Sequence, residues 1–341
     1  MFGFLMCSLC ENFLSGAAKS CSCRVKNGKL RSENGVDKLP RTGYNILMKG
    51  LIVINAYWRA ECVTEQAGRI KEELEKAGAE AEVRRNGFLP CSAGRGIVSE
   101  VAGSCDFCVY LDKDKYLSAL LEAGGMRLFD THAAIALCDD KMATYTELAR
   151  RGIPVPRTVP APLCYTPGSV PSADMLDKAE RLFGYPMVVK TSYGSGGKGV
   201  YKADCRAELE DIERRLLFSP HMFQEYIRPS EGRDVRVITI GGKVLGAMLR
   251  RAPEGEFRSN IAAGGSGTPF ELDDAGRELC ERVSSVVGAD YAGIDLLFGE
   301  DGYVVCEVNS NAFFGGFERA CGVNVAKAYA EHIVRAMGGK A

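Results

Sequence analysis

From residue 48 onward, apolar runs alternate with segments of helical periodicity. Leu51–Asn55 begins as a continuous apolar run, which is typical of a buried parallel strand. A helical pattern over 63–77 follows and ends at Gly78, and shorter strand and helix patterns continue to residue 130 (strands near 80–84, 106–111 and 126–129, helix 115–123). This alternation predicts a doubly wound parallel sheet over about 48–130.

The remainder of the chain predicts a mixture of helices and strands. A helix is expected over 133–151, ending at Gly152 before an extended Pro-containing segment. Beyond it the pattern predicts helices over 172–183, 273–287 and 322–337, and strands over 186–190, 235–240, 243–250, 292–298 and 303–309.

Residues 1–47 differ from the rest of the chain. They hold seven Lys and Arg against three Asp and Glu, a net charge of +4, and they show no sustained period of 2 or 3.6. Cys7-x-x-Cys10 and Cys21-x-Cys23 could form a small zinc site, but the second pair is tighter than usual zinc spacing. We therefore interpret 1–47 as an extension outside the core, with Met48 as an alternative start.

Composition narrows the class of protein. The 341 residues carry 43 Lys and Arg against 44 Asp and Glu, a net charge of −1, which argues against nucleic-acid binding through bulk basicity. No apolar run reaches the 18 residues that a membrane helix needs. The 14 cysteines are mostly spread through apolar runs, a pattern that favours a reducing compartment and a cytoplasmic location.

A glycine-rich stretch follows the strand that ends at Lys190. Gly194-Ser195-Gly196-Gly197-Lys198-Gly199 fits G-x-G-x-x-G, yet Val200–Ala203 continues as strand where a dinucleotide-binding loop needs a helix. A Walker A loop is excluded because Gly199 takes the place of Ser or Thr. What remains is a hairpin that closes over phosphates with its N–H groups and Lys198, or a loose surface hairpin; Lys190 favours the first interpretation.

Two acidic strands near the C-terminus carry the strongest chemical signal. A turn at 299–302 predicts a hairpin that places Asp295 opposite Glu307, with Asn309 on the same face as Glu307. Two carboxylates facing each other in an apolar hairpin repel and are costly to desolvate, and a bound cation relieves both effects. Oxygen ligands favour Mg²⁺ or Mn²⁺; the alternative is an exposed hairpin that tolerates the charges.

Between these two motifs lie further polar residues with a recognisable order. The segment Met222–Ile227, which contains Gln224, Glu225 and Tyr226, reads as a strand entering a linker. Asp234, Arg250 and Phe257-Arg258-Ser259-Asn260 follow it. Together with Lys141, Lys190, the 194–199 loop, Asp295 and Glu307-Val308-Asn309, this order resembles the ATP-grasp superfamily, in particular its ribosomal-protein-S6-modifying glutamate ligase branch. The resemblance spans about 130–337, and more loosely 48–130.

The resemblance implies an α/β ATP-grasp fold: the extension 1–47, an N-terminal parallel-sheet domain (48–132), and two α+β subdomains that clasp ATP (133–224 and 225–341). It implies that Lys141, Lys190 and the 194–199 loop contact ATP phosphates, that Glu225 and Tyr226 hold adenine, and that Asp234 lies near the ribose. It also implies Arg250, Arg258 and Asn260 as catalytic residues, with Arg258, Ser259 and Asn260 touching the nucleotide. Asp295, Glu307 and Asn309 match the metal ligands.

The implied activity is an ATP-dependent carboxylate–amine ligase that works through an acyl-phosphate. The implied partners are ATP with Mg²⁺ or Mn²⁺, an amino acid, and an acceptor such as a peptide or protein tail. The resemblance is also compatible with a homo-oligomer. Ala262-Ala263 and the stretch after Asn309 depart from the branch on its acceptor side. A small-molecule kinase and a non-catalytic ATP-binding module remain as alternatives.

Because residues 1–47 lack core periodicity, we expect a chain that begins at Met48 to keep its fold and its ATP-dependent activity. Soluble yield and ADP release compare it with the full chain. Loss of soluble protein on truncation, or one equivalent of zinc in the full chain, would contradict this prediction.

Overall fold

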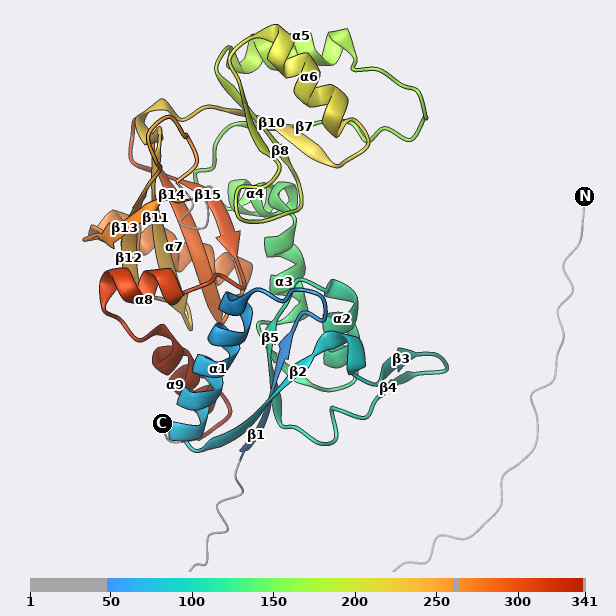
Figure 1. The fold of residues 1–341 in the computed structure, drawn as a ribbon, viewed down its shortest axis with the longest axis vertical. Helices are drawn as coiled ribbons and strands as arrows, with labels where there is room; N and C mark the ends of the chain where they lie inside the picture. The colour runs from blue at the N-terminus through green and yellow to red at the C-terminus, as the bar shows by residue number, and fades with distance from the viewer. Residues whose placement is uncertain (1–47, 260–263, 340–341) are drawn as a thin grey trace, which may run out of the picture. The chain divides into compact units, whose positions relative to one another are not determined.

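The computed structural model describes residues 48–259 and 264–339, so the predictions for residues 1–47, Asn260, Ala262 and Ala263 lie outside the described residues. Its first layer is a parallel sheet in the order β2-β1-β5-β6 (Figure 1). This confirms the parallel sheet expected from the alternating pattern. The elements of this region are β1 (Met48–Ile54), α1 (Glu61–Lys76), β2 (Ala79–Arg85), η1 (Asn86–Phe88), β3 (Cys91–Ala93), β4 (Ile97–Ser99), β5 (Phe107–Leu111), α2 (Lys115–Ala123) and β6 (Arg127–Phe129).

A second, antiparallel sheet has the order β7-β10-β8-β9. Helices α5 and α6 lie together on one side of it (Figure 1), and Leu176, Leu209 and Ile212 pack with Met187 and Phe223 in a core of its own. The bounds are β7 (Thr158–Pro160), α5 (Ala173–Phe183), β8 (Met187–Thr191), β9 (Val200–Ala203), α6 (Arg206–Leu216) and β10 (His221–Glu225).

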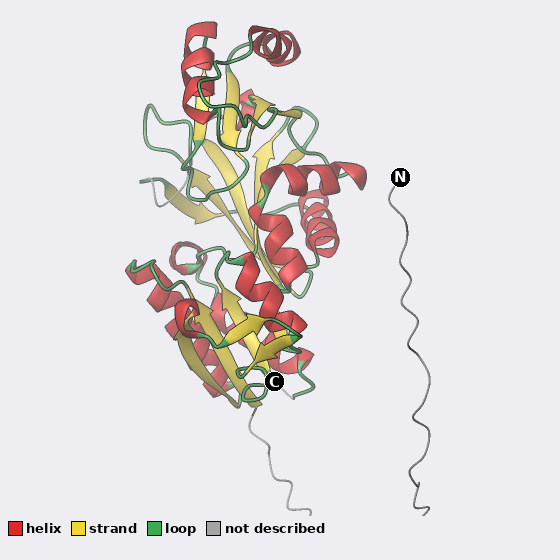
Figure 2. Cartoon of the chain, turned by 90° about the vertical axis from the view of Figure 1, so that its right-hand side faces the viewer, coloured by secondary structure: helices red, strands yellow, loops and turns green. Residues whose placement is uncertain are grey.

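A third sheet contains five antiparallel strands in the order β13-β12-β11-β14-β15. One face of this sheet packs against α3 (His132–Asp139), α4 (Lys141–Arg150) and α7. The other face has charged residues at one end and an apolar region at the other, and the apolar region packs on α8, α9 and α1. Figure 2 shows these helices in red and the strands in yellow. The bounds are η2 (Arg228–Ser230), β11 (Arg233–Ile240), β12 (Lys243–Arg251), β13 (Ser266–Pro269), α7 (Asp274–Val287), β14 (Tyr291–Phe298), β15 (Tyr303–Asn309), α8 (Gly315–Cys321) and α9 (Val325–Ala336).

Two helix predictions were wrong in their bounds. The segment expected as one helix over 133–151 forms α3 (His132–Asp139) and α4 (Lys141–Arg150), because the Asp140 side chain caps α4 by accepting from the N–H groups of Met142 and Ala143. The helix expected over 322–337 starts at Val325, after the shorter α8 ends at Gly322 with φ of 69°.

The packing also departs from the predicted boundary at residue 133. Ala134, Cys138 and Leu148, on α3 and α4, belong to the apolar cluster of the five-stranded sheet and α7. The separate core of the central sheet begins at Ala161. Residues 132–150 therefore pack with the C-terminal sheet, because their apolar faces meet α7 and not β7–β10. The other domain boundaries remain predictions.

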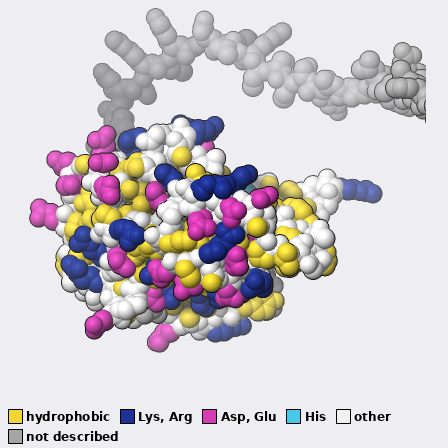
Figure 3. Space-filling model, turned by 90° about the horizontal axis from the view of Figure 1, so that it is seen from above, with side chains coloured by type: hydrophobic (Ala, Val, Ile, Leu, Met, Phe, Trp, Pro, Cys, Tyr) yellow, Lys and Arg dark blue, Asp and Glu magenta, His cyan; other side chains and the backbone are white. Residues whose placement is uncertain are grey.

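The surface and the helices add two observations. On the face seen in Figure 3, Lys and Arg side chains are interspersed with Asp and Glu side chains, in keeping with the near-zero net charge. Within residues 48–259 and 264–339, no helix combines the length and the apolar character required to cross a membrane.

A buried ion pair ties α6 to β10 inside the central core. The His221 ring faces two acceptors: Nε2 lies 2.6 Å from Glu213 Oε2, and Nδ1 lies 2.7 Å from the Ser219 carbonyl oxygen. Burial alone would lower the pKa of His221, but the hydrogen bonds to Glu213 and Ser219 outweigh it and raise the pKa above its usual value. Acceptors at both nitrogens favour the imidazolium form of the ring.

A raised histidine pKa makes stability depend on pH. The contribution of this pair is fully present below the unfolded pKa of about 6.5 and is lost as the pH rises through the folded pKa. We expect the free energy of unfolding of the wild type to fall above about pH 6.5 relative to His221→Leu/Glu213→Leu, which lacks both charges. Urea unfolding from pH 6 to 9 measures this difference; parallel pH profiles for the two proteins would contradict it.

Candidate functional site

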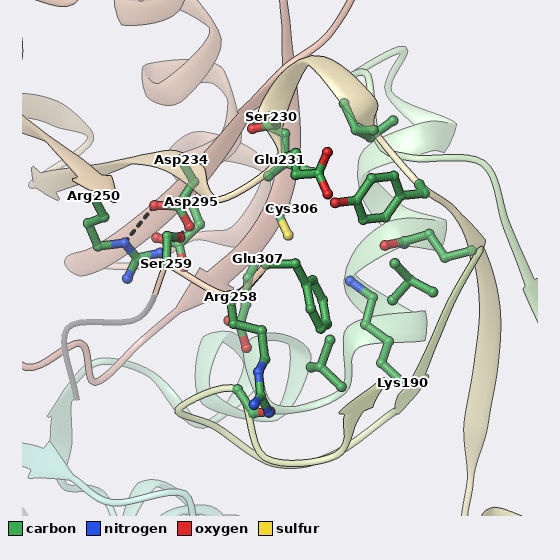
Figure 4. A pocket seen from close by; sticks show the side chains of 18 of the residues that line it. Lys190, Ser230, Glu231, Asp234, Arg250, Arg258, Ser259, Asp295, Cys306 and Glu307 are labelled. Carbon is green, nitrogen blue, oxygen red and sulfur yellow. Dashed lines mark hydrogen bonds and ion pairs between the residues drawn. The ribbon is translucent and has the colours of Figure 1, made fainter. Parts of the chain in front are cut away.

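Most of the predicted site residues line one cavity of about 900 Å³, measured to include its opening to solvent (Figure 4). The cavity lies between the central sheet, the glycine-rich loop and the five-stranded sheet. Gly196, Gly199 and Asn309 are not among its lining residues, and Asn260 lies outside the described residues. The predicted residues that line it are Lys141, Lys190, Gly194, Ser195, Gly197, Lys198, Glu225, Tyr226, Asp234, Arg250, Arg258, Ser259, Asp295 and Glu307.

Two lysines from different elements enter the cavity beside Glu307. Lys141, the first residue of α4, donates from Nζ to the Gly194 carbonyl at 2.8 Å and lies 3.2 Å from Glu307 Oε1. Lys190, on β8, is buried and donates to the Tyr145 hydroxyl at 2.7 Å. The break before α4 matters here, since it lets the Lys141 N–H reach the Ser192 carbonyl at 2.9 Å and fixes the lysine against the loop.

The glycine-rich loop contacts the opposite wall of the cavity through an arginine. Arg258 donates from Nη1 to the Gly197 carbonyl at 3.2 Å, while its Nη2 lies 2.7 Å from Glu256 Oε2. Hydrogen bonds from Arg258 outweigh the small effect of burial and lower the pKa of Glu256 to about 2. Glu256 is thus ionised at neutral pH and holds the Arg258 guanidinium toward the loop.

The hairpin of β14 and β15 contains the predicted pair of acidic residues, but its register is not that of a regular hairpin. Asp295 lies opposite Glu307, which confirms the predicted pair. Nearer the turn, however, Phe298 pairs with Tyr303 and Leu296 with Val305, so a regular hairpin would have placed Cys306 opposite Asp295. A β-bulge next to Asp295 takes up the extra residue and brings Glu307 round to it.

Each of the two hairpin carboxylates is paired with cationic side chains of the chain itself. The prediction that they repel each other unless a cation binds was therefore wrong. Asp295 accepts two hydrogen bonds from Arg236, one from Nε and one from Nη2 at 2.8 Å, and lies 2.9 Å from Arg250 Nη2. Burial alone would raise the pKa of Asp295, but Arg236 and Arg250 outweigh it and hold the pKa below its usual value. Glu307 has Lys141 as its partner.

Asp234 completes this set of buried charges. Both of its carboxylate oxygens accept from Arg250, each at 2.6 Å, and Figure 4 shows Arg250, Asp234 and Asp295 together on one side of the cavity, with Lys190 on the other. The role implied for Asp234 near a ribose remains a prediction. Both carboxylate oxygens of Asp234 are occupied by Arg250 in this structure. The sequence reasoning missed Arg236 as a residue of this network. A single arginine on a strand is normally interpreted as a solvated charge, and its partner Asp295 is found only when the neighbouring strand is known.

The other end of the cavity is less polar. Glu225 Oε1 accepts from the Arg157 N–H at 2.7 Å, so its carboxylate is tied to the chain leading into β7. Burial raises the pKa of the Tyr226 hydroxyl, and the Glu231 carboxylate beside it adds to this effect. The sequence reasoning missed the apolar lining from two strands, Val188 of β8 and Leu297 of β14, whose only signal was alternation along those strands; Ile227 and Phe257 line the cavity from the segments after β10 and β12.

The donor atoms suit a hard cation better than a soft one. Within the part of the chain that the structure describes, no group of three or more His, Cys, Asp and Glu side chains could hold a metal ion. The oxygens of Asp295 and Glu307 instead need a third ligand of another type, and Asn309 lies opposite Gly293, two residues before Asp295. A set built from two carboxylates and one amide oxygen fits Mg²⁺ or Mn²⁺.

Comparison with known proteins identifies similar chains. A family model described as the RimK-like ATP-grasp domain matches residues 138–333. Beta-citrylglutamate synthase B of Danio rerio is 40% identical over 229 residues, which cover 66% of this chain and 55% of that protein. Glutamate–LysW ligase ArgX of Sulfurisphaera tokodaii is 34% identical over 225 residues, covering 64% of this chain and 76% of that protein.

A solved structure has a similar fold. The RimK domain ATP-grasp protein of Sphaerobacter thermophilus superposes with a TM-score of 0.64 at 22% identity, covering 83% of this chain and 98% of that one. At this identity the likeness concerns the fold alone. The chain spans just over half the length of the β-citrylglutamate synthases that it matches.

The buried charge network predicts unequal effects of removing the two hairpin carboxylates in the absence of nucleotide and metal. Asp295→Asn leaves Arg236 and Arg250 without a shared anion and should lower the free energy of unfolding by about 3 kcal/mol. Glu307→Gln removes one partner of Lys141, which keeps its hydrogen bond to the Gly194 carbonyl, and should lower the free energy of unfolding less than Asp295→Asn does. Urea unfolding in EDTA measures both; equal effects, or a stabilised Asp295→Asn, would contradict the network.

Proposed function

The chain belongs to the RimK-like ATP-grasp family, and on this basis we propose that it is an ATP-dependent carboxylate–amine ligase. The proposed reaction forms an amide bond through an acyl-phosphate and converts ATP to ADP and phosphate. The observation that carries the proposal is the cavity itself, in which one end holds lysines, arginines and the carboxylates of Asp234, Asp295 and Glu307 while the other end is less polar. Such a division suits a ligand with a planar base and a chain of phosphates.

The cations support the binding of phosphates. Lys141, Lys190 and Lys198 line the cavity near the glycine-rich loop, and Arg258 reaches the same loop from the other side. The loop also offers backbone N–H groups, which bind phosphate oxygens without a side chain. Together these groups neutralise charge that develops as a phosphoryl group is transferred.

The proposed chemistry needs no nucleophile from the protein. A carboxylate oxygen of the substrate attacks the γ-phosphorus and ADP leaves; an amine then attacks the acyl carbon and phosphate leaves. Burial raises the pKa of Cys306, the one cysteine among the described lining residues, to about 11 against the opposing effect of Lys190. At neutral pH this thiol is protonated and is therefore a poor nucleophile.

Asp295, Glu307 and Asn309 are the residues that would hold a divalent cation. Mg²⁺ or Mn²⁺, when bound, supplies charge neutralisation at the phosphate oxygens. The protein's own part is to hold both carboxylates beside the cavity by ion pairs, Asp295 with Arg236 and Arg250 and Glu307 with Lys141. Because the cations already present balance these carboxylates, the site is preorganised before any ligand arrives.

The names of the relatives narrow the substrates to be tested. β-Citrylglutamate synthase B, N-acetylaspartylglutamate synthase A and glutamate–LysW ligase all name glutamate in their product or substrate. We propose glutamate as the first amine to test. Candidate carboxylates are citrate, N-acetylaspartate and a peptide that ends in glutamate, as representatives of small acids and protein tails.

The proposed function predicts that ADP release requires both an amine and a carboxylate, with a product mass equal to their sum less one water. The assay supplies ATP, Mg²⁺, L-glutamate and each carboxylate in turn. Glu307→Gln should lower turnover about 10²-fold, because it removes a proposed ligand of the cation. Glu281 lies on α7 away from the cavity and pairs with Lys243 of β12, so Glu281→Gln is the matched control and should retain turnover.

Three outcomes would contradict the ligase. ADP release without an amine, with a stable phosphorylated product, would indicate a kinase. ATP binding without ADP release under any combination would indicate a regulatory module. Wild-type turnover in Glu307→Gln would remove the proposed cation site.

A further inference from the structure

Arg236 lies just outside the nucleotide cavity, on the far side of Asp295. It extends from β11 toward Asp295 on β14 and is absent from the lining of the cavity, whereas Asp295 and Arg250 are part of that lining. Within the described residues, its only ion pair is with Asp295. Its Nε and Nη2 are engaged there, and Nη1 makes no hydrogen bond to any described residue.

The room for Arg236 is provided by a glycine. A Cβ atom at Gly293 would lie 2.4 Å from Ala312 Cβ and 3.3 Å from Arg236 Nη1, so only glycine lets the guanidinium and the chain after Asn309 approach here. Arg236 Nη1 thus lies beside the segment that follows β15. This arginine is at the junction between the proposed cation site and that segment.

Charge balance indicates what this junction binds. Arg236, Arg250, Asp234 and Asp295 are two positive and two negative groups, and they are balanced only while Asp295 is shared by the two arginines. If Asp295 serves a divalent cation, Arg250 keeps both oxygens of Asp234, but Arg236 loses its only partner. A nearly buried guanidinium without an anion is costly, so the loaded site requires a new anion at Arg236.

We propose that Arg236 binds the carboxylate of the substrate that becomes phosphorylated, exchanging Asp295 for that carboxylate when a divalent cation binds Asp295. This inference rests on the proposed ligase function. A planar guanidinium suits a carboxylate because the two can form paired hydrogen bonds. The exchange couples the binding of the cation to the binding of the carboxylate. The cation removes Asp295 as a competitor for Arg236, and the carboxylate removes Arg236 as a competitor for Asp295.

The first test needs no turnover. Mn²⁺ binding in the presence of ADP, without a carboxylate substrate, is measured by the loss of the free-Mn²⁺ electron paramagnetic resonance signal. Arg236→Met, which keeps the length and removes the charge, should bind Mn²⁺ several-fold more tightly, because Asp295 has lost a competing cation. The matched control Arg206→Met removes an arginine paired with Asp177, Glu180 and Glu210 outside the cavity and should leave Mn²⁺ binding unchanged. Unchanged or weaker binding in Arg236→Met would overturn the exchange.

The second test uses the carboxylate that supports ADP release by the wild type. Arg236→Met should raise the KM for that carboxylate about 10- to 100-fold, as expected for the loss of a charged hydrogen-bonded pair, while the KM for ATP stays within about twofold. Equal increases in both constants would overturn the assignment to the carboxylate. If Arg236→Met does not fold, Arg236→Lys, which keeps the charge but loses the paired geometry, should still raise the KM for the carboxylate alone.

The two tests separate this inference from the proposed function. If no carboxylate supports ADP release by the wild type, the ligase and the carboxylate assignment both fail. The Mn²⁺ comparison then still decides whether Arg236 and a divalent cation compete for Asp295.

Discussion

The alternation of buried charges across β12, β11 and β14 is the constraint on which the site depends. Arg250 lies opposite Asp234, and Arg236 lies opposite Asp295, so the antiparallel register of three strands sets each ion pair. A shift of one residue would turn each side chain to the other face of the sheet and leave charges in the apolar layer against α7. The cost of burying unpaired charge therefore specifies the register as strongly as the packing does.

This arrangement also explains how a strongly polar site can exist before any ligand binds. Asp234, Asp295 and Glu307 each have a cationic partner from the chain itself, and those partners come from β11, β12 and α4. A ligand with phosphates and a cation would exchange partners with these groups. These three carboxylates are thus paired in the ligand-free form, which limits the electrostatic cost of keeping the site formed.

The predicted pairing of Asp295 with Glu307 is present, but a β-bulge produces it and not the regular hairpin from which it was predicted. Sequence patterns predicted the order of the elements well, because that order follows from periodicities within single segments. They failed where the answer depends on another segment. The bulge beside Asp295 and the partner of Arg236 require knowledge of how β14 aligns with β15 and β11. The break at Asp140 had a local signal, an aspartate able to cap a helix, which the longer apolar period concealed. The family resemblance supplied what periodicity could not, namely the combination of two α+β subdomains around one cavity.

The separate core of the central sheet has a mechanical consequence. Its apolar cluster contains only residues from Ala161 to Phe223 and the side chains packed on them, whereas the cluster that joins α1 to α9 mixes residues from both ends of the described chain. The first and last thirds of residues 48–339 must therefore unfold together. The central sheet has an apolar cluster that neither of those thirds shares, so loss of its packing would leave the other clusters intact. Amide hydrogens of β11 and β14 would then exchange only on global unfolding, and those of β8 and β10 would exchange by opening of the central sheet alone.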